Sequence, residues 1–146
     1  MLTFPLAILI VASIFDVRSR EIPDWIPLLM IVSAVVAVTF DWIPLSFAQS
    51  LLGVGVGFLI TLPLAWMGGL GGGDLKLVSA LGAWFGPIAL VCVLFWVAIA
   101  GLVLSAAFWV RGKKDLPYVP AIAIGLAIFL CWPQGILVLL KSLTTR

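Results

Sequence analysis

The chain has 146 residues, of which 64% are apolar and only 10% are charged. A soluble domain averages roughly half apolar and about a quarter charged residues, so this composition excludes an ordinary soluble globular protein. The net charge of +2 is too small to indicate a nucleic-acid partner. The sequence has no histidine, which excludes histidine-based catalytic triads and the common zinc sites.

The charged residues leave long uncharged stretches, and a helix needs about 20 apolar residues to cross a bilayer. A first helix is expected over Leu2–Phe15. It lacks a basic segment before it and a cleavage site after it, so we interpret it as a retained helix rather than a signal peptide. A second helix is expected over Trp25–Phe40 and a third over Ser46–Met67.

A fourth helix is expected to begin near Leu75, after a glycine-rich segment, and to end at the Gly86–Pro87 pair, because proline interrupts a helix. A fifth should cover Ile88–Val110. The polar segment 111–117 is expected to be a loop, followed by a sixth helix over Tyr118–Leu140. The sequence therefore predicts an all-α polytopic membrane protein, a bundle of six transmembrane helices.

Basic residues predict the orientation of this bundle. Arg18 and Arg20 follow the first helix, which by the positive-inside rule places the N-terminus outside and the 16–24 loop in the cytoplasm. Six spans then place the C-terminus outside as well. No loop is long enough to hold a folded domain, so residues 1–146 are expected to form a single integral-membrane domain.

Two groups of glycines show the spacing typical of closely packed membrane helices. Gly53 and Gly57 form one G-x-x-x-G pattern, with Gly55 between them, and Gly82 and Gly86 form another. We interpret these glycines as helix-packing positions.

Two acids stand at the ends of apolar stretches, on the same predicted side of the membrane. Asp16 ends the first helix, and Asp74 lies between Gly71–Gly73 and the fourth helix. Each alone has a simple explanation, since Asp74 could cap its helix and Asp16 could pair with a nearby arginine. Together with glycines that allow close backbone approach, they are candidates for a catalytic pair.

Two carboxyl groups held close together share a proton, because both cannot ionise cheaply. The ionised group then takes a proton from water, while the protonated group donates to the carbonyl of the bond under attack. A nucleotide is not expected, since the glycine-rich segment lacks the lysine of a phosphate loop and Asp74 would repel phosphate. The two cysteines, Cys92 and Cys131, form no C-x-x-C pattern, so we expect no metal and no cofactor.

These residues resemble the type IV prepilin peptidases, a family of membrane aspartyl proteases. The segment 71–77, GGGDLKL, matches the family's G-x-G-D-x-K-L signature. The segment 16–24, DVRSREIPD, looks like its first motif, an aspartate followed by Ile-Pro-Asn or Ile-Pro-Asp. The resemblance implies that Asp16 and Asp74 are catalytic. It assigns substrate-binding or supporting positions to the remaining motif residues, which are Gly71, Gly73, Lys76, Ile22, Pro23 and Asp24.

The resemblance further implies a substrate, a prepilin with a basic leader peptide followed by an apolar helix. Cleavage would take place at the cytoplasmic face of a bacterial inner membrane, among membrane lipid. The chain looks like the short members associated with Flp/Tad pili, for which no N-methyltransferase activity is expected. The segment Pro117–Ala121 resembles the family's Pro-Phe-Gly-Pro-Ala, with Val119 in place of glycine. Glu21 and Asp24 are interpreted as solvated loop charges.

Two alternatives remain open at this stage. A non-enzymatic transporter or pilus-assembly scaffold would use Asp16 and Asp74 to bind a cation or a proton. An archaeal preflagellin peptidase would share the two aspartates and cleave a different substrate.

Overall fold

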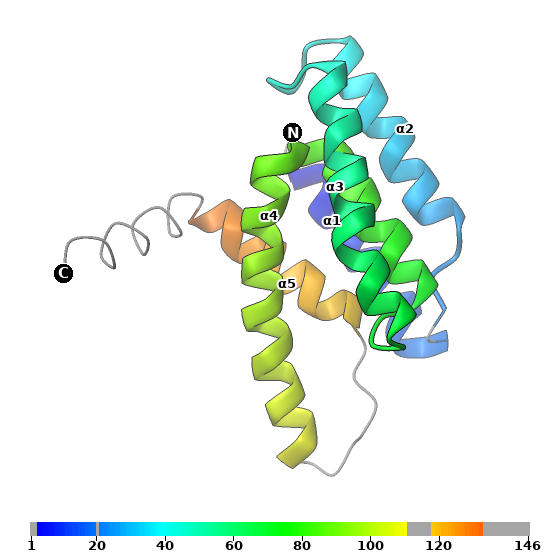
Figure 1. The fold of residues 1–146 in the computed structure, drawn as a ribbon, viewed down its shortest axis with the longest axis vertical. Helices are drawn as coiled ribbons and strands as arrows, with labels where there is room; N and C mark the ends of the chain where they lie inside the picture. Colours follow the sequence, from blue (N-terminus) through cyan, green and yellow to red (C-terminus); the bar gives the residue numbers. More distant parts are fainter. Residues whose placement is uncertain (1–2, 20, 111–117, 133–146) are drawn as a thin grey trace, which may run out of the picture.

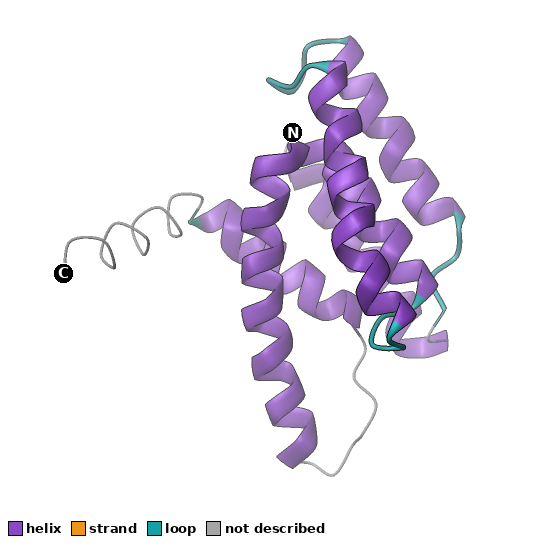
Figure 2. Cartoon of the chain, in the orientation of Figure 1, coloured by secondary structure: helices purple, strands orange, loops and turns teal. Residues whose placement is uncertain are grey.

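The computed structural model describes residues 3–19, 21–110 and 118–132. Within these ranges helices joined by short loops are the only regular secondary structure (Figure 2). The helices are α1 (Thr3–Ser19), α2 (Trp25–Thr39), α3 (Phe47–Trp66), α4 (Gly72–Val110) and α5 (Tyr118–Cys131). The predicted loop at 111–117, its basic residues and the end of the last predicted helix lie outside the described residues.

Helix α4 covers both the fourth and the fifth predicted helices as one element with a break inside it. The break lies at Gly86, whose φ of 70° and ψ of 177° are not helical. The chain changes direction there, so that the two limbs of α4 are separate rods (Figure 1). The position of the predicted interruption is therefore confirmed, and the described chain has five helical elements rather than six.

Pro87 and Gly86 both contribute to this break, each by a different effect. Pro87 has no N–H, so the carbonyl of Ala83, four residues earlier, loses its usual helical partner. The buried hydroxyl of Ser50 on α3 donates to that carbonyl at 2.8 Å. Gly86 supplies the positive φ that a side chain would strain. Because a neighbouring helix satisfies the freed carbonyl, the break is tolerated inside an apolar bundle.

Helices α3 and α4 pack together along a stripe of small residues. The buried positions of α3 are Ser50, Gly53, Gly57 and Thr61, spaced so that they fall on one face. A Cβ added at Gly53 would overlap the backbone carbonyl of Gly82, and one added at Gly57 would lie 2.9 Å from the carbonyl oxygen of Val78. The predicted packing role is confirmed for these glycines. Gly55 differs, since nothing lies within 4 Å of its added Cβ.

The core is small and the outer surface is apolar. The large, fully buried side chains of the core come from four of the helices and include Leu9, Ile26, Met30, Leu77, Leu81, Leu90, Ile122 and Leu126. Two helical segments, Phe47–Trp66 and Gly72–Ala107, are long and apolar enough to cross a membrane. Only 22% and 17% of the residues in their most apolar 18-residue stretches are buried, so most of these side chains face outward rather than into a core.

Several chain segments meet at one end of the bundle. The last turns of α1, the connection before α2, the turn between α3 and α4 and the first turn of α5 all lie there (Figure 1). Both predicted motifs are on these segments.

Candidate active site

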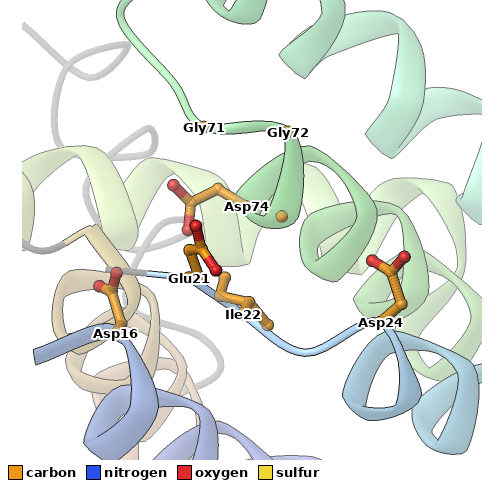
Figure 3. A pocket seen from close by; sticks show the side chains of 8 residues that line it. Asp16, Glu21, Ile22, Asp24, Gly71, Gly72 and Asp74 are labelled. Carbon is orange, nitrogen blue, oxygen red and sulfur yellow. The ribbon is translucent and has the colours of Figure 1, made fainter. Parts of the chain in front are cut away.

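Asp16 and Asp74 line the same pocket, although they come from opposite halves of the sequence. Each is only 8% exposed. The pocket has a volume of about 380 Å³ and is formed by Asp16, Glu21, Ile22, Asp24, Gly71, Gly72, Gly73 and Asp74. Both carboxyl groups point into the space between α1 and the start of α4 (Figure 3). The two acids that the sequence singles out are thus brought together.

Asp16 is buried because it continues the inward face of α1. The buried residues of this helix are Pro5, Ile8, Leu9, Ala12 and Asp16, which recur every three or four positions. Its carboxylate oxygen Oδ2 accepts a hydrogen bond of 3.0 Å from the backbone N–H of Val119, in the first turn of α5. The N-terminus of α5 therefore lies against Asp16, where the helix dipole favours a negative charge.

Asp74 lies in the first turn of α4. A Cβ added at Gly71 would be 3.3 Å from Asp74 Oδ2, so the glycine leaves room for the carboxyl group. The other oxygen, Oδ1, is buried and has no hydrogen-bond partner among the described residues. An unpaired buried polar atom is costly, and one that faces a pocket is available to a ligand.

The two motifs also contact each other away from the acids. A Cβ added at Gly73 would lie 3.0 Å from the Cβ of Ile22, so glycine lets the Ile22 side chain pack directly against the backbone at position 73. Lys76 Nζ pairs with Asp24 Oδ1 at 2.7 Å. The carbonyl of Pro23 accepts the N–H of Ile26 at 3.0 Å and so closes the turn that begins α2.

The predicted supporting residues differ in how exposed they are and in what they contact. Lys76 and Asp24 are largely exposed, with side chains 53% and 77% accessible. An exposed pair of this kind contributes about 0–1 kcal/mol, so it joins the two motifs without adding much stability. Ile22 packs partly buried against the core. The three glycines are not equivalent, because nothing lies within 4 Å of a Cβ added at Gly72.

Two features near the two acids are absent from the predicted site. Glu21 is exposed, as expected of a solvated loop charge, and its side chain also lines the pocket that holds Asp16 and Asp74 (Figure 3). The backbone of Val119 is the second, and the only sequence signal for it is the resemblance of segment 117–121 to a family motif. Within the described ranges, no group of three or more potential ligands is placed to hold a metal ion.

For the peptidase activity that the sequence resemblance implies, Gly73 and Gly55 give a matched pair of variants. We expect Gly73→Ala to reduce that activity at least about tenfold, because its methyl group would push Ile22 and the pocket wall apart. Gly55→Ala should keep wild-type activity, since Gly55 does not line the pocket and its methyl group meets nothing within 4 Å. Cleavage assays on both purified variants check this, and equal activities would contradict it.

A helical bundle with two buried carboxyl groups facing one pocket defines an acidic site on a largely apolar scaffold. Comparison with known proteins specifies the family. The model of the type IV leader peptidase family matches residues 3–106, and the chain belongs to this family.

Individual relatives agree with this assignment. The chain is 32% identical over 124 residues to the "Type 4 prepilin-like proteins leader peptide-processing enzyme" of Escherichia coli O78:H11, covering 80% of this chain and 46% of the relative. It is 32% identical over 127 residues to the "Prepilin leader peptidase/N-methyltransferase" of Bacillus subtilis, covering 82% and 50%. A protein of the same name from Dichelobacter nodosus is 28% identical over 123 residues, covering 80% and 43%. The chain thus spans about half the length of these relatives. No solved structure matches it.

Proposed function

We propose that this protein is a membrane-embedded aspartic endopeptidase that removes the basic leader peptide from type IV prepilins of the Flp/Tad type. The observation that carries the proposal is the convergence of Asp16 and Asp74, each 8% exposed, on one pocket. The family match and the names of the relatives support the reaction and the substrate class.

In the proposed mechanism a water molecule lies between the two carboxyl groups. One aspartate takes a proton from this water while the other donates a proton to the carbonyl oxygen of the scissile bond. The Oδ1 of Asp74 is suited to meet that carbonyl, since Asp74 lines the pocket and this buried oxygen has no partner of its own among the described residues. As these protons move, the water oxygen bonds to the carbonyl carbon, which gives a tetrahedral intermediate with two hydroxyl groups. When the C–N bond breaks, the leaving nitrogen receives the proton that the first aspartate took from water, and the second aspartate recovers a proton from one hydroxyl as the new carboxyl group forms.

The substrate is proposed to bring its leader into an acidic pocket. Glu21 and Asp24 line this pocket with the two aspartates, Asp24 being paired with Lys76, and none of the lining residues that the structure describes is basic. A basic leader segment therefore meets complementary charge. The apolar helix of the prepilin would remain in the bilayer, next to the outward-facing apolar surface of α3 and α4.

The topology belongs to the same proposal. We propose six membrane crossings, with the two limbs of α4 counted separately, both termini outside and the pocket at the cytoplasmic face of a bacterial inner membrane. The asymmetry of basic residues supports this orientation. The absence of N-methyltransferase activity stays a prediction, and the names of two of the relatives include that activity.

Co-expression with a candidate Flp-type prepilin in a host that lacks its own prepilin peptidases tests the function. We expect a shortened product on a gel, and mass spectrometry of its N-terminus would report both the cleavage site and any methylation. A preflagellin offered in parallel tests the archaeal alternative. Failure to process any of these substrates, together with proton-coupled solute uptake, would favour a transporter.

A further inference from the structure

We infer that the first turn of α5 is a third component of the active site, and that the backbone N–H of Val119 is a positioning group for Asp16. This inference rests on the proposed peptidase function. It adds a part of the chain that lies outside both aspartate motifs.

The observation that supports this inference is a buried hydrogen bond between two residues 103 positions apart in sequence. The N–H of Val119 donates to Asp16 Oδ2 at 3.0 Å. Val119 is fully buried, and Asp16 is 8% exposed. In a site shielded from water, a hydrogen bond from an N–H to a carboxylate is stronger than at the surface.

The place of Val119 in its helix explains why this donor is available. The first four N–H groups of a helix have no partner within the helix. Val119 is the second residue of α5, so its N–H is one of these unsatisfied groups. Binding to Asp16 therefore satisfies a buried donor and holds a carboxyl group with a single contact.

This contact distinguishes the two oxygens of Asp16. Oδ2 is held by α5, which leaves Oδ1 for the water molecule of the proposed reaction. An aspartate side chain has two rotatable bonds, and fixing one oxygen restricts both of them. The N-terminus of α5 thus keeps Asp16 aimed at the pocket, where catalysis needs a fixed geometry.

The use of a backbone donor also explains why a valine can stand at position 119. Because the contact uses the main chain, it does not depend on the side chain, and valine serves where the family segment has glycine. The valine side chain instead packs into the core.

Val119→Pro tests the inference directly, since proline has no N–H. The first turn of a helix tolerates proline, so the substitution removes the donor without breaking a helical hydrogen bond. With detergent-purified protein and a prepilin substrate, we expect kcat to fall about 10- to 100-fold, the usual effect of losing a hydrogen bond to a charged group, with KM unchanged.

Ile122→Ala is the matched control, because Ile122 is also buried in α5 and its substitution removes packing while the N–H of Val119 stays in place. It should lower the unfolding temperature but keep kcat within about twofold of wild type when assayed well below that temperature. Wild-type kcat in Val119→Pro, or an equal loss of kcat in both variants, would overturn the inference. If Val119→Pro does not fold, a variant in which an ester replaces the backbone amide at position 119 makes the same test. It removes the N–H and keeps the valine side chain.

A second readout does not depend on peptidase activity. In protein labelled with 15N-valine, the Val119 amide, identified by its loss in Val119→Ala, should resonate at low field because it is bound to a carboxylate. This low-field position should disappear in Asp16→Ala. A Val119 amide unaffected by Asp16→Ala would overturn the contact, whereas a positive result without cleavage of any prepilin would overturn only the proposed function.

Discussion

Replacing either Asp16 or Asp74 with asparagine is expected to abolish leader removal. Asparagine keeps the size of the side chain and one acceptor oxygen, so the contact with Val119 is retained at position 16. It cannot exchange protons with water or with the substrate carbonyl. Loss of an essential acid or base lowers the rate by about 10²- to 10⁴-fold, which gel-based processing would record as no product.

The chain offers a matched control for this experiment. Asp41 is an exposed acid in the connection between α2 and α3, with a φ of 54°. Asparagine tolerates that left-handed conformation as well as aspartate does, so Asp41→Asn should fold and process normally. All three variants should reach the membrane at wild-type levels. Substantial turnover by Asp16→Asn or by Asp74→Asn would remove the two-aspartate mechanism.

The second large effect is on folding rather than on chemistry. Gly53→Ala should destabilise the bundle by about 3 kcal/mol, the upper end of the range for an overpacked core. The added methyl group would overlap the carbonyl of Gly82, and backbone atoms cannot rotate away as a flexible side chain does. Helices α3 and α4 would have to move apart where Gly53 meets Gly82.

Gly55→Ala provides the comparison, since the same methyl group there meets nothing within 4 Å. It should unfold at or slightly above the wild-type temperature, because alanine favours a helix more than glycine does. Thermal unfolding of both variants in detergent checks the prediction. Equal unfolding temperatures for Gly53→Ala and Gly55→Ala would contradict it.

Much of the candidate site is readable in the sequence because scarce residue types mark it. In a chain with 10% charge, Asp16 and Asp74 stand out at the ends of apolar stretches. The interruption at Gly86–Pro87 is equally visible, since proline removes a backbone donor wherever it occurs. These features depend on local chemistry, and the structure places them where the sequence predicts.

Other features depend on which segments meet in space. Three features require the start of α4 to lie against the connection before α2. These are the Lys76–Asp24 pair, the fit of Gly73 against Ile22 and the shared pocket of Glu21 and Asp74. The sequence shows these residues but not their partners. Composition alone treats Gly71, Gly72 and Gly73 alike, whereas the resemblance singles out the first and the third, and these are the two with close neighbours in the structure.

Composition and spacing by themselves determined an apolar helical protein, the break inside α4, the small-residue face of α3 and the two acids of the site. Only the tertiary structure decided that α5 holds Asp16 and that Ser50 compensates for Pro87. The physical reason is that burial and helix breaking follow from residue types along the chain. A hydrogen bond between distant segments, by contrast, exists only once packing has brought a donor without a partner to an acceptor.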